Sequence, residues 1–288
     1  MTPSALSLAA GVVEGATARS LPAVYQRITE IIDHPLSSSG DIAKVVSEDP
    51  ALTARLLGLV NSAFFGSPNK IETVSVAISV IGTEQLRDLA LATCVIHMFD
   101  DVPQQTLNME TFWLHSLAVA TFARTLAVHR REGNVERFFL AGLLHDIGGL
   151  ILLMQRSSNA KRNLKRSART GELLHVVEKR AMGFDHADVG RALLKAWNLP
   201  LSLQDAVGSH HRPGAALGFP REAAVVHVAD IISSALEIGS SGELLVPPLE
   251  PSAWELIGLP TNHISSLIDE GEAHISDVVR TMLWDQES

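Results

Sequence analysis

The chain has very little of what stabilises secreted or β-rich proteins. Its 288 residues include one cysteine and one tyrosine, and aromatic residues make up 5% of the total. A single cysteine excludes an internal disulfide and fits a reducing compartment. Cys94 lies among apolar neighbours and is interpreted as a small core residue. The scarcity of aromatic residues argues against an all-β sandwich.

Basic charge is also scarce. Lysine and arginine together number 23 against 32 acidic residues, which gives a formal net charge of −9. This balance disfavours the whole molecule as a non-specific nucleic-acid or membrane-surface binder. We find no run near the ~20 apolar residues needed to cross a bilayer, and the first 20 residues lack the basic leader of a signal peptide. We therefore expect a cytoplasmic protein without a membrane partner.

What the sequence does contain is apolar residues at helical spacing, within a composition that is 46% hydrophobic. The spacing and the flanking Pro, Gly and Asp signals predict helices over 21–32, 50–65, 74–81, 83–99, 109–129, 135–154, 172–182, 185–197, 201–211, 222–238, 252–257 and 261–283. Asp41 is expected to cap a short helix over 42–46. No segment alternates like a strand, so the fold class is predicted to be all-α.

The order of these helices suggests four segments. We expect an N-terminal extension over 1–20, an N-terminal helical part over 21–103, a helical core over 104–240 and a C-terminal helical extension over 241–288. The sequence Asp100-Asp101-Val102-Pro103 is a plausible seam between the second and third segments. The N-terminal helical part is predicted to pack on the core bundle.

The motif most informative for function is AGLLHDIGGL, where His145 and Asp146 stand side by side in an apolar helical run. An imidazole and a carboxylate are both good ligands for a divalent transition metal. Neither is cheap to bury among leucines without a partner or an ion. Further candidate ligands lie on both sides along the chain: His115, His186, His210, His211 and Asp230.

Each candidate also has a purely structural interpretation. A lone histidine such as His115 on an apolar face is usually satisfied by a hydrogen bond, Asp230 could be a buried ion-pair partner, and His210-His211 could be an exposed helix end. The joint pattern on predicted helices favours metal binding. His97, His129, His175, His227, His263 and His274 are interpreted as structural or surface residues.

One or two bound metal ions would supply a hydroxide nucleophile near neutral pH and polarise a phosphoryl oxygen. That chemistry suits phosphoester hydrolysis. The sequence shows no Ser–His or Cys–His alternative, and the phosphate-binding loop GxxxxGK[ST] is absent.

AGLLHDIGGLIL, with FWLHS before it and VVHVADII after it, resembles the HD superfamily of metal-dependent phosphohydrolases. The chain is more specifically similar to HDOD domain proteins, the HD-related output domains of bacterial signalling. The segments LPAVYQRITEII, EDPALTARLLGLVNSAFFG, VSVAISVIGTEQLRDLAL and GFDHADVGRALLKAWNLP carry this match over about residues 20–240. The resemblance implies an all-helical fold with an N-terminal helical cap on an HD-like core.

The HD pattern implies metal ligands at His115, His145, Asp146 and Asp230. The related HD-GYP phosphodiesterases of cyclic di-GMP imply further ligands at His186, His210 and His211, and their GYP signature is weakly echoed by Gly218-Phe219-Pro220. The implied cofactor is one or two divalent ions of Fe, Mn, Zn, Ni or Mg. The chain departs from the HD pattern at one position that bears on catalysis. Gly149 stands where a lysine that can contact phosphate usually follows HDIG.

A basic run stands out against the acidic background directly after this motif. Lys161, Arg162, Lys165 and Arg166, with Arg156 and Arg169 nearby, recur at spacings of three and four. The run is either a solvated helix face or an anion site for a phosphorylated ligand, a nucleotide or an acidic partner surface. It is too short and too poor in aromatic residues to indicate sequence-specific nucleic-acid recognition.

Two functions follow as expectations. The first is a bacterial, cytoplasmic signalling module that acts through protein–protein contacts, with Asp146 and its neighbours retained as a metal-binding or ligand-sensing pocket. The second is a metal-dependent phosphohydrolase, with Asp146 in its catalytic site and cyclic dinucleotides among its candidate substrates. A nucleotide second messenger and a second copy of the chain remain open as partners.

Overall fold

The computed structural model describes residues 4–15, 20–66, 69–99, 102 and 106–284. It contains no strand within these ranges, which confirms the predicted all-α class. The helices are α1 (Ala5–Gly15), α2 (Ala23–Asp33), α3 (Ser39–Ser47), α4 (Pro50–Asn61), η1 (Ala63–Phe65), α5 (Val74–Ile81), α6 (Thr83–His97), α7 (Met109–His129), α8 (Val135–Leu144), α9 (Ile147–Gln155), α10 (Ser157–Thr170), α11 (Leu174–Met182), α12 (His186–Ala196), α13 (Leu201–Gly208), η2 (Pro213–Ala215), α14 (Pro220–Ala235), α15 (Pro251–Ile257), η3 (Thr261–His263), α16 (Ile264–Val279) and η4 (Arg280–Trp284).

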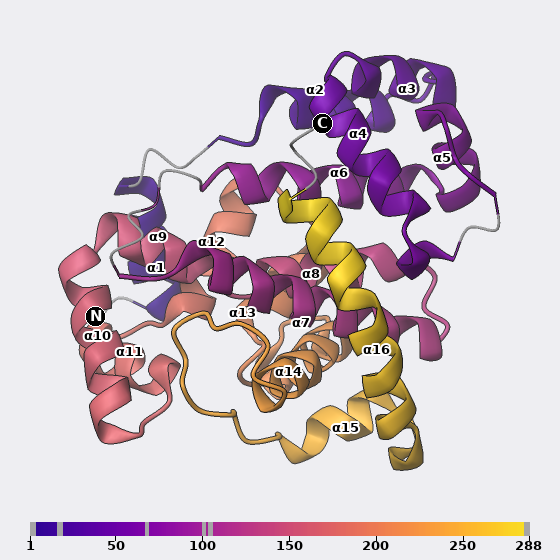
Figure 1. Ribbon diagram of the computed structural model, residues 1–288. Coiled ribbons are helices and arrows are strands. Elements are labelled where there is room, and N and C mark those ends of the chain that lie inside the picture. The colour runs from indigo at the N-terminus through magenta and orange to yellow at the C-terminus, as the bar shows by residue number, and fades with distance from the viewer. Residues whose placement is uncertain (1–3, 16–19, 67–68, 100–101, 103–105, 285–288) are drawn as a thin grey trace.

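Helices α2 to α6 form the N-terminal group at the upper right of Figure 1. The start of α3 differs from the prediction. Ser38 is its N-cap, and Asp41 is the third helical residue, whose carboxylate accepts a hydrogen bond from the Ser38 backbone N–H at 2.9 Å. The two side chains form a capping box, which places the helix start three residues earlier than expected.

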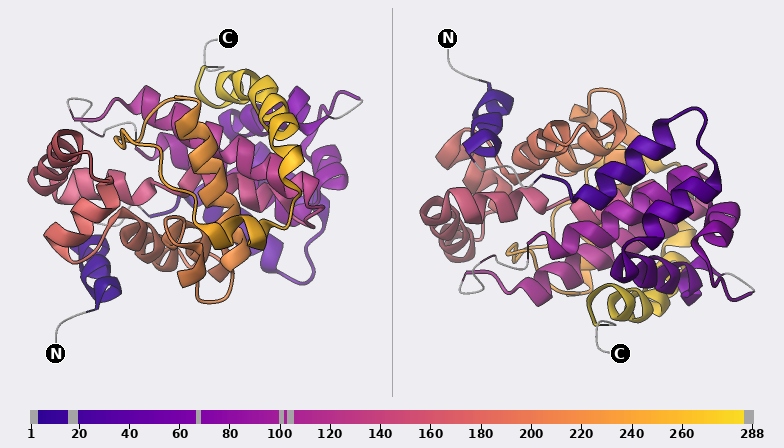
Figure 2. Two further views of the ribbon diagram at one scale, coloured as in Figure 1. Left: turned by 90° about the horizontal axis from the view of Figure 1, so that it is seen from below. Right: turned by 90° about the horizontal axis from the view of Figure 1, so that it is seen from above.

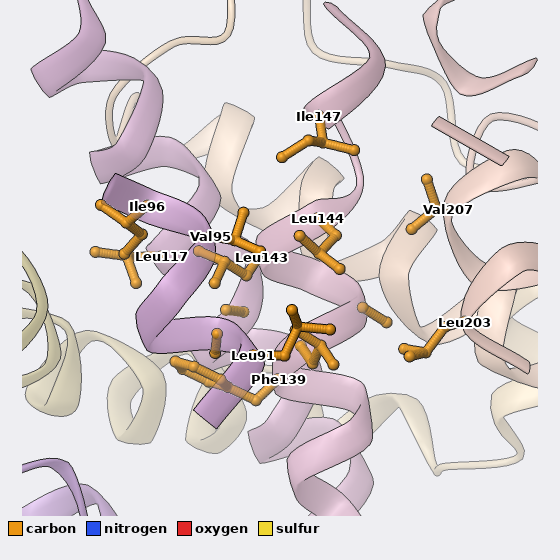
Figure 3. Close-up of a cluster of buried hydrophobic side chains, with 14 of the residues drawn as sticks. Leu91, Val95, Ile96, Leu117, Phe139, Leu143, Leu144, Ile147, Leu203 and Val207 are labelled. Atoms are coloured by element: carbon orange, nitrogen blue, oxygen red, sulfur yellow. The ribbon is translucent and has the colours of Figure 1, made fainter. Parts of the chain in front are cut away.

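Helix α6 connects this group to the rest of the molecule by packing on α8. Helix α7 packs on α8, α14 and α16 and lies at the centre of the second half of the fold. Figure 3 shows Val95 of α6, Leu117 of α7 and Leu143 of α8 meeting in one apolar cluster. Buried apolar side chains continue from this cluster into nearly every helix, so the described residues share one core.

The predicted helix over 135–154 is interrupted. Helix α8 ends at Leu144 and α9 begins at Ile147, so His145 and Asp146 lie in a two-residue break between them. The apolar periodicity is the same on both sides, and it does not reveal the break. The prediction of one continuous helix was therefore wrong at the two residues with most bearing on function.

The two ends of the described chain pack on different parts of the fold. Helix α1 packs on α12 and α9, far from the α2–α5 group in both Figure 1 and Figure 2. Helix α16 packs on α7, and η4 after it contacts α4, so the C-terminal segment joins the two halves. The division into four segments stays a prediction, and Asp100, Asp101 and Pro103 of the expected seam lie outside the described residues.

One stretch, Val135–Gln155, does have the length and apolar composition of a membrane span, contrary to the sequence-based expectation. Its most apolar window is 83% buried inside the protein, and His145 and Asp146 interrupt it. Such burial is typical of a core helix in a soluble protein.

Candidate metal centre

Three of the predicted ligands form a first group. His115 projects from α7, Asp230 from α14 and His145 from the break after α8. His115 Nε2 lies 3.2 Å from Asp230 Oδ1, and His145 Nε2 lies 4.0 Å from the same oxygen. All three side chains are buried, and one ligand atom from each lies within 4.8 Å of the others.

His186, His210 and His211 form a second group, whose ligand atoms also lie within 4.8 Å of one another. His186 is the first residue of α12, as predicted, and a capping box between Asp185 and Asp188 fixes the start of that helix. Helix α13 ends at Gly208, so His210 and His211 lie in the turn after it and not in the helix predicted over 201–211. A turn lets both consecutive imidazoles reach one site.

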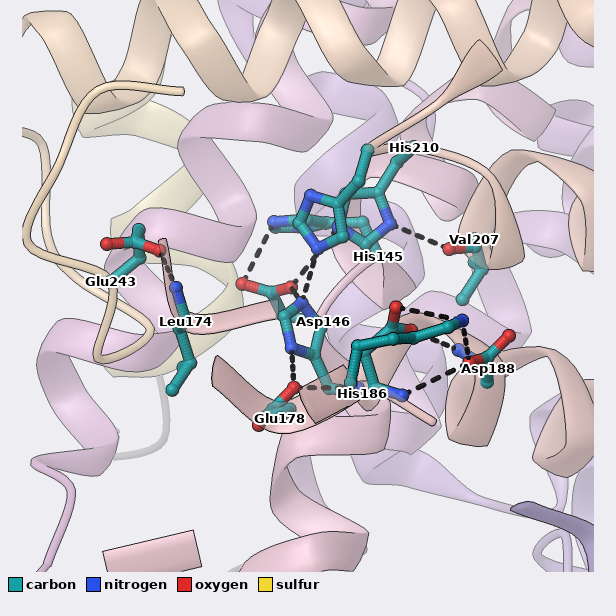
Figure 4. A network of polar contacts seen from close by, with 12 residues as sticks. His145, Asp146, Leu174, Glu178, His186, Asp188, Val207, His210 and Glu243 are labelled. Atoms are coloured by element: carbon teal, nitrogen blue, oxygen red, sulfur yellow. Dashed lines mark hydrogen bonds and ion pairs between the residues drawn. The ribbon is translucent and has the colours of Figure 1, made fainter. Parts of the chain in front are cut away.

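Asp146 lies between the two groups (Figure 4). Its Oδ2 is 3.2 Å from His145 Nε2, and its Oδ1 is 3.1 Å from His186 Nε2 and 3.6 Å from His210 Nε2. Two ligands of one tetrahedral ion, each about 2.1 Å from the metal, lie roughly 3.4 Å apart. The spacing therefore fits a carboxylate shared between two ions.

The orientation of the rings also fits a metal. His145 Nδ1 donates to the Gly142 carbonyl and His210 Nδ1 donates to the Val207 carbonyl, both at 2.7 Å. These bonds aim each Nε2 at Asp146, yet His145 Nε2, His210 Nε2 and Asp146 Oδ1 are buried without a hydrogen bond of acceptable geometry. Buried polar atoms are nearly always satisfied, and a cation bound by all three would satisfy them.

Glu178 is a functional residue that sequence reasoning missed. Its carboxylate accepts hydrogen bonds from His186 Nδ1 at 2.7 Å and from the His186 backbone N–H at 2.9 Å. A carboxylate behind a ligand histidine fixes the ring and raises its basicity. Burial favours neutral His186, but Glu178 and Asp146 outweigh burial and raise the pKa of His186 well above its ordinary value.

The other pKa shifts describe the charges of the metal-free site. Burial opposes ionisation of Asp146, yet His145 and His186 hold its pKa well below the ordinary value. Burial lowers the pKa of His210 to about 3, and the neighbouring His145 and His186 act in the same direction. Protons on His145 and His186 thus balance the carboxylate, and a metal ion would take their place.

Two glycines allow the backbones that carry the ligands to approach closely. A Cβ on Gly142 of α8 would lie 2.7 Å from Ala120 Cα of α7, the helix that carries His115. A Cβ on Gly148 of α9 would lie 2.0 Å from the His186 carbonyl oxygen. Only glycine permits these crossings, which bring helices from different parts of the sequence to one site.

A buried polar network supports the turn that holds His210 and His211. Arg191 donates to Asp205 Oδ1 at 2.8 Å and to Ser209 Oγ at 2.6 Å. Asp205 Oδ2 accepts from the backbone N–H groups of Gly218 and Phe219 at 2.7 and 3.0 Å. The segment that echoes the GYP signature therefore anchors a loop on Asp205.

The segment 238–250, here called the strap, covers the site. Ser240 N–H donates to the Thr111 carbonyl at 2.9 Å, Glu243 accepts from Leu174 N–H at 2.6 Å, and Glu250 N–H donates to His227 Nε2 at 3.0 Å. The strap side chains Ser241, Glu243 and Pro247 line a cavity of about 30 Å³ together with the ligand side chains. That volume holds ions and one or two waters, and it is far too small for a nucleotide.

Two histidines first interpreted as structural or surface residues support the ligands directly. His175 stacks on His211 with ring centroids 4.0 Å apart. His227 Nδ1 donates to the His210 carbonyl at 2.7 Å. The sequence around His175 and His227 did not indicate this supporting role, because both residues contact the turn after α13, which is distant from them in the sequence.

The four basic candidates do not reach this site. Lys161, Arg162, Lys165 and Arg166 lie exposed on α10 and line a separate surface hollow. Gly149 does line the metal cavity, with open space beside it where the usual lysine side chain would project.

The donor set indicates which metals fit. Five imidazoles and two carboxylates converge, and imidazole suits Zn, Fe and Ni, whereas Mg prefers oxygen ligands. The residues therefore fit a transition metal better than magnesium.

Comparison with known proteins supports this description of the fold. A curated uncharacterized protein of Treponema pallidum is 28% identical over 203 residues, which is 66% of this chain and 37% of that protein. The chain thus spans little more than a third of this relative's length.

Two crystal structures are similar over almost the whole chain. An HDOD domain protein of unknown function from Geobacter sulfurreducens superposes with a TM-score of 0.79 at 24% identity, covering 97% of this chain and 98% of its own. A protein of Shewanella amazonensis, provisionally described as a phosphohydrolase, gives 0.75 at 22% identity, covering 96% and 99%. At these identities the likeness shows a shared fold.

The family itself is shown by a sequence model. The model of the HDOD domain matches residues 19–213, about two thirds of the chain and nearly the range over which the motifs resemble that family. The matched range includes the N-terminal helices α2 to α6 and every predicted ligand except Asp230. The chain belongs to the HDOD domain family.

Proposed function

We propose that this chain is a bacterial, cytoplasmic signalling module that acts through protein contacts and holds one or two divalent metal ions in its HD-type site. The family membership and the bacterial relatives support the signalling role. The buried ligand set supports the metal.

One observation carries the metal assignment. The Asp146 carboxylate lies 3.1 to 3.6 Å from imidazole nitrogens of both histidine groups, and buried ring nitrogens on each side lack hydrogen bonds. A purely structural cluster would be expected to satisfy these atoms among themselves. A cation next to Asp146 would satisfy these buried nitrogens in both histidine groups and so remove the free-energy cost of burying them unpaired.

The strap favours a regulatory role over catalysis. The cavity of about 30 Å³ beneath the strap is smaller than a phosphoester, and the larger hollow of about 360 Å³ beside it meets it at His175, His211 and Pro247. Gly149 also removes the cation that would contact a phosphate. The bound metal then acts as a structural or sensing element whose presence stabilises the core beneath the strap.

A phosphohydrolase is the second candidate, and the shared carboxylate is the observation that favours it. Metal ions held by Asp146 and the two histidine groups would supply the hydroxide and the charge stabilisation that phosphodiester hydrolysis requires. Substrate access would require the strap to move away from Leu174, His227 and Thr111.

Metal analysis together with a hydrolysis assay distinguishes the signalling module from the phosphohydrolase. The purified protein is analysed for bound metals and assayed with bis(p-nitrophenyl) phosphate and cyclic di-GMP, with Mn²⁺ or Fe²⁺ added. The double variant His145→Ala/Asp146→Ala is compared with His34→Ala, whose exposed imidazole lies on the surface after α2. We expect metal in the wild type and in His34→Ala, none in the double variant, and no turnover.

Turnover that the double variant abolishes and His34→Ala retains would establish the enzyme. Absence of metal from the wild-type protein after loading would overturn the metal assignment and leave only a helical scaffold.

A further inference from the structure

Helix α10 presents an exposed face on which five cations gather. Lys161, Arg162, Lys165, Arg166 and Arg169 are all exposed, and the helix contains no acidic residue. Together with Ser158 they line one shallow hollow of about 730 Å³. On a chain with a net charge of −9, this is a local reversal of charge.

These cations differ from the paired basic residues elsewhere. Arg124 pairs with Glu136 at 2.9 Å, Arg191 with Asp205 at 2.8 Å and Lys179 with Asp188 at 2.6 Å. Within the described part of the chain, none of the five α10 cations has a carboxylate within 4 Å. Glu172 attracts Arg166 only at longer range, so the face carries no ion pair with the acidic residues that the structure describes.

The inner face of α10 shows why the outer face stays in solvent. Ala160, Asn163 and Ser167 are buried, and the helix packs on α9 and α11. The five cations form two adjacent rows, Lys161, Lys165 and Arg169 in one and Arg162 and Arg166 in the other, along about 12 Å of the helix. A solvent-exposed, rigid array of this length matches one acidic helix or extended acidic segment.

We propose that the basic face of α10 is the docking surface for an acidic segment of a protein partner. This names a partner for the signalling module proposed above and rests on that proposal. Carboxylates of the segment would pair with the two rows of cations, and Arg162, Arg166 and Arg169 can each bind a carboxylate in bidentate fashion.

Two other polyanions fit the face less well. A membrane surface requires apolar side chains beside the cations, and no large hydrophobic side chain of α10 is exposed. Single-stranded nucleic acid requires aromatic residues for stacking, and α10 has none. A duplex would continue beyond the helix over a surface that is acidic overall.

The experiment measures binding of a fluorescein-labelled 14-residue peptide with glutamates at spacings of three and four, against the same peptide with glutamine in place of glutamate. The test variant carries glutamine at Lys161, Arg162, Lys165 and Arg166. Glutamine has nearly the helix propensity of Lys and Arg, so α10 is preserved. The control variant carries glutamine at four exposed cations elsewhere, Lys44, Lys70, Lys195 and Arg221, and so has the same net charge.

We expect the acidic peptide to bind at low ionic strength, the α10 variant to lose roughly tenfold or more in affinity, and the control variant to lose much less. Added salt should weaken the binding in parallel. No binding to the wild type, or an equal loss in both variants, would overturn the proposal. Tighter binding of duplex DNA or of phosphatidylserine vesicles than of the peptide would overturn it as well.

Metal content is measured on the same samples. A protein without metal that still binds the peptide through α10 would contradict only the metal centre. A metal-loaded protein that fails to bind would contradict only the docking surface.

Discussion

At the scale of single residues, the site depends on groups that no motif announces. The seven ligand candidates could be selected from the sequence because histidine and aspartate are conspicuous in apolar helices. Glu178 could not, since it lies eight residues before His186 in an ordinary amphipathic helix and reaches it only across the turn between α11 and α12. Sequence patterns reveal ligands more readily than the residues that orient them.

The role of Glu178 is testable with an isosteric change. Glu178→Gln keeps the shape but removes the charge behind His186, so the imidazole becomes a weaker base and a weaker ligand. We expect metal affinity to fall roughly 10- to 100-fold, measured by competition with a chromophoric chelator. Glu172→Gln, a nearby change at a partly exposed residue paired with Arg180, serves as the control. Equal affinities in wild type and Glu178→Gln would refute the orienting role.

At the scale of elements, the helices were largely predictable and their interruptions were not. The spacing of apolar residues located α7, α12 and α14 to within two or three residues. It could not show the break at His145-Asp146, because the flanking residues there remain apolar, and it placed the end of α13 at His211, three residues beyond Gly208. What decides these breaks is the tertiary contact between helices, above all where glycines let two backbones meet.

Two adjacent glycines in α9, Gly148 and Gly149, allow a test of the close contact between helices. A Cβ on Gly148 would lie 2.0 Å from the His186 carbonyl oxygen and 2.5 Å from Gly190 N of α12, whereas a Cβ on Gly149 would have nothing within 4 Å. Gly148→Ala should therefore destabilise the protein by about 1–3 kcal/mol through overpacking. Gly149→Ala should stabilise it by about 0.5–1 kcal/mol.

Urea unfolding of the chelator-treated variants measures both effects. Since the two positions are neighbours in one helix, propensity alone predicts the same gain for each. If the two alanine variants proved equally stable, the close contact between α9 and α12 would be wrong.

At the scale of the whole molecule, burial of so many histidines makes stability depend on pH. Burial lowers the pKa of His210 to about 3 and that of His211 well below its ordinary value. As the pH falls below about 6.5, the unfolded chain protonates both residues and the folded chain does not. The unfolded state then binds more protons, so the free energy of unfolding must fall.

The expected loss for the metal-free protein between pH 6.5 and 5.5 is up to about 1.4 kcal/mol per pH unit for each of the two histidines. His145 and His186 have raised pKa values, so only the unfolded chain takes up protons on them as the pH falls from 6.5 to 5.5, and they offset part of this loss. Urea unfolding at several pH values measures the dependence. The variant His210→Gln/His211→Gln should flatten it, and a wild-type protein whose stability rose on acidification would contradict the burial of neutral imidazoles.

The central claim is that imidazoles and carboxylates from five parts of the chain surround a metal centre at Asp146. The most direct measurement is anomalous scattering from crystals of the protein loaded with Mn²⁺ or Fe²⁺. The account predicts strong peaks beside Asp146, one near His115, His145 and Asp230 or one near His186, His210 and His211, or both. Loaded crystals with no peak within bonding distance of Asp146 would contradict it.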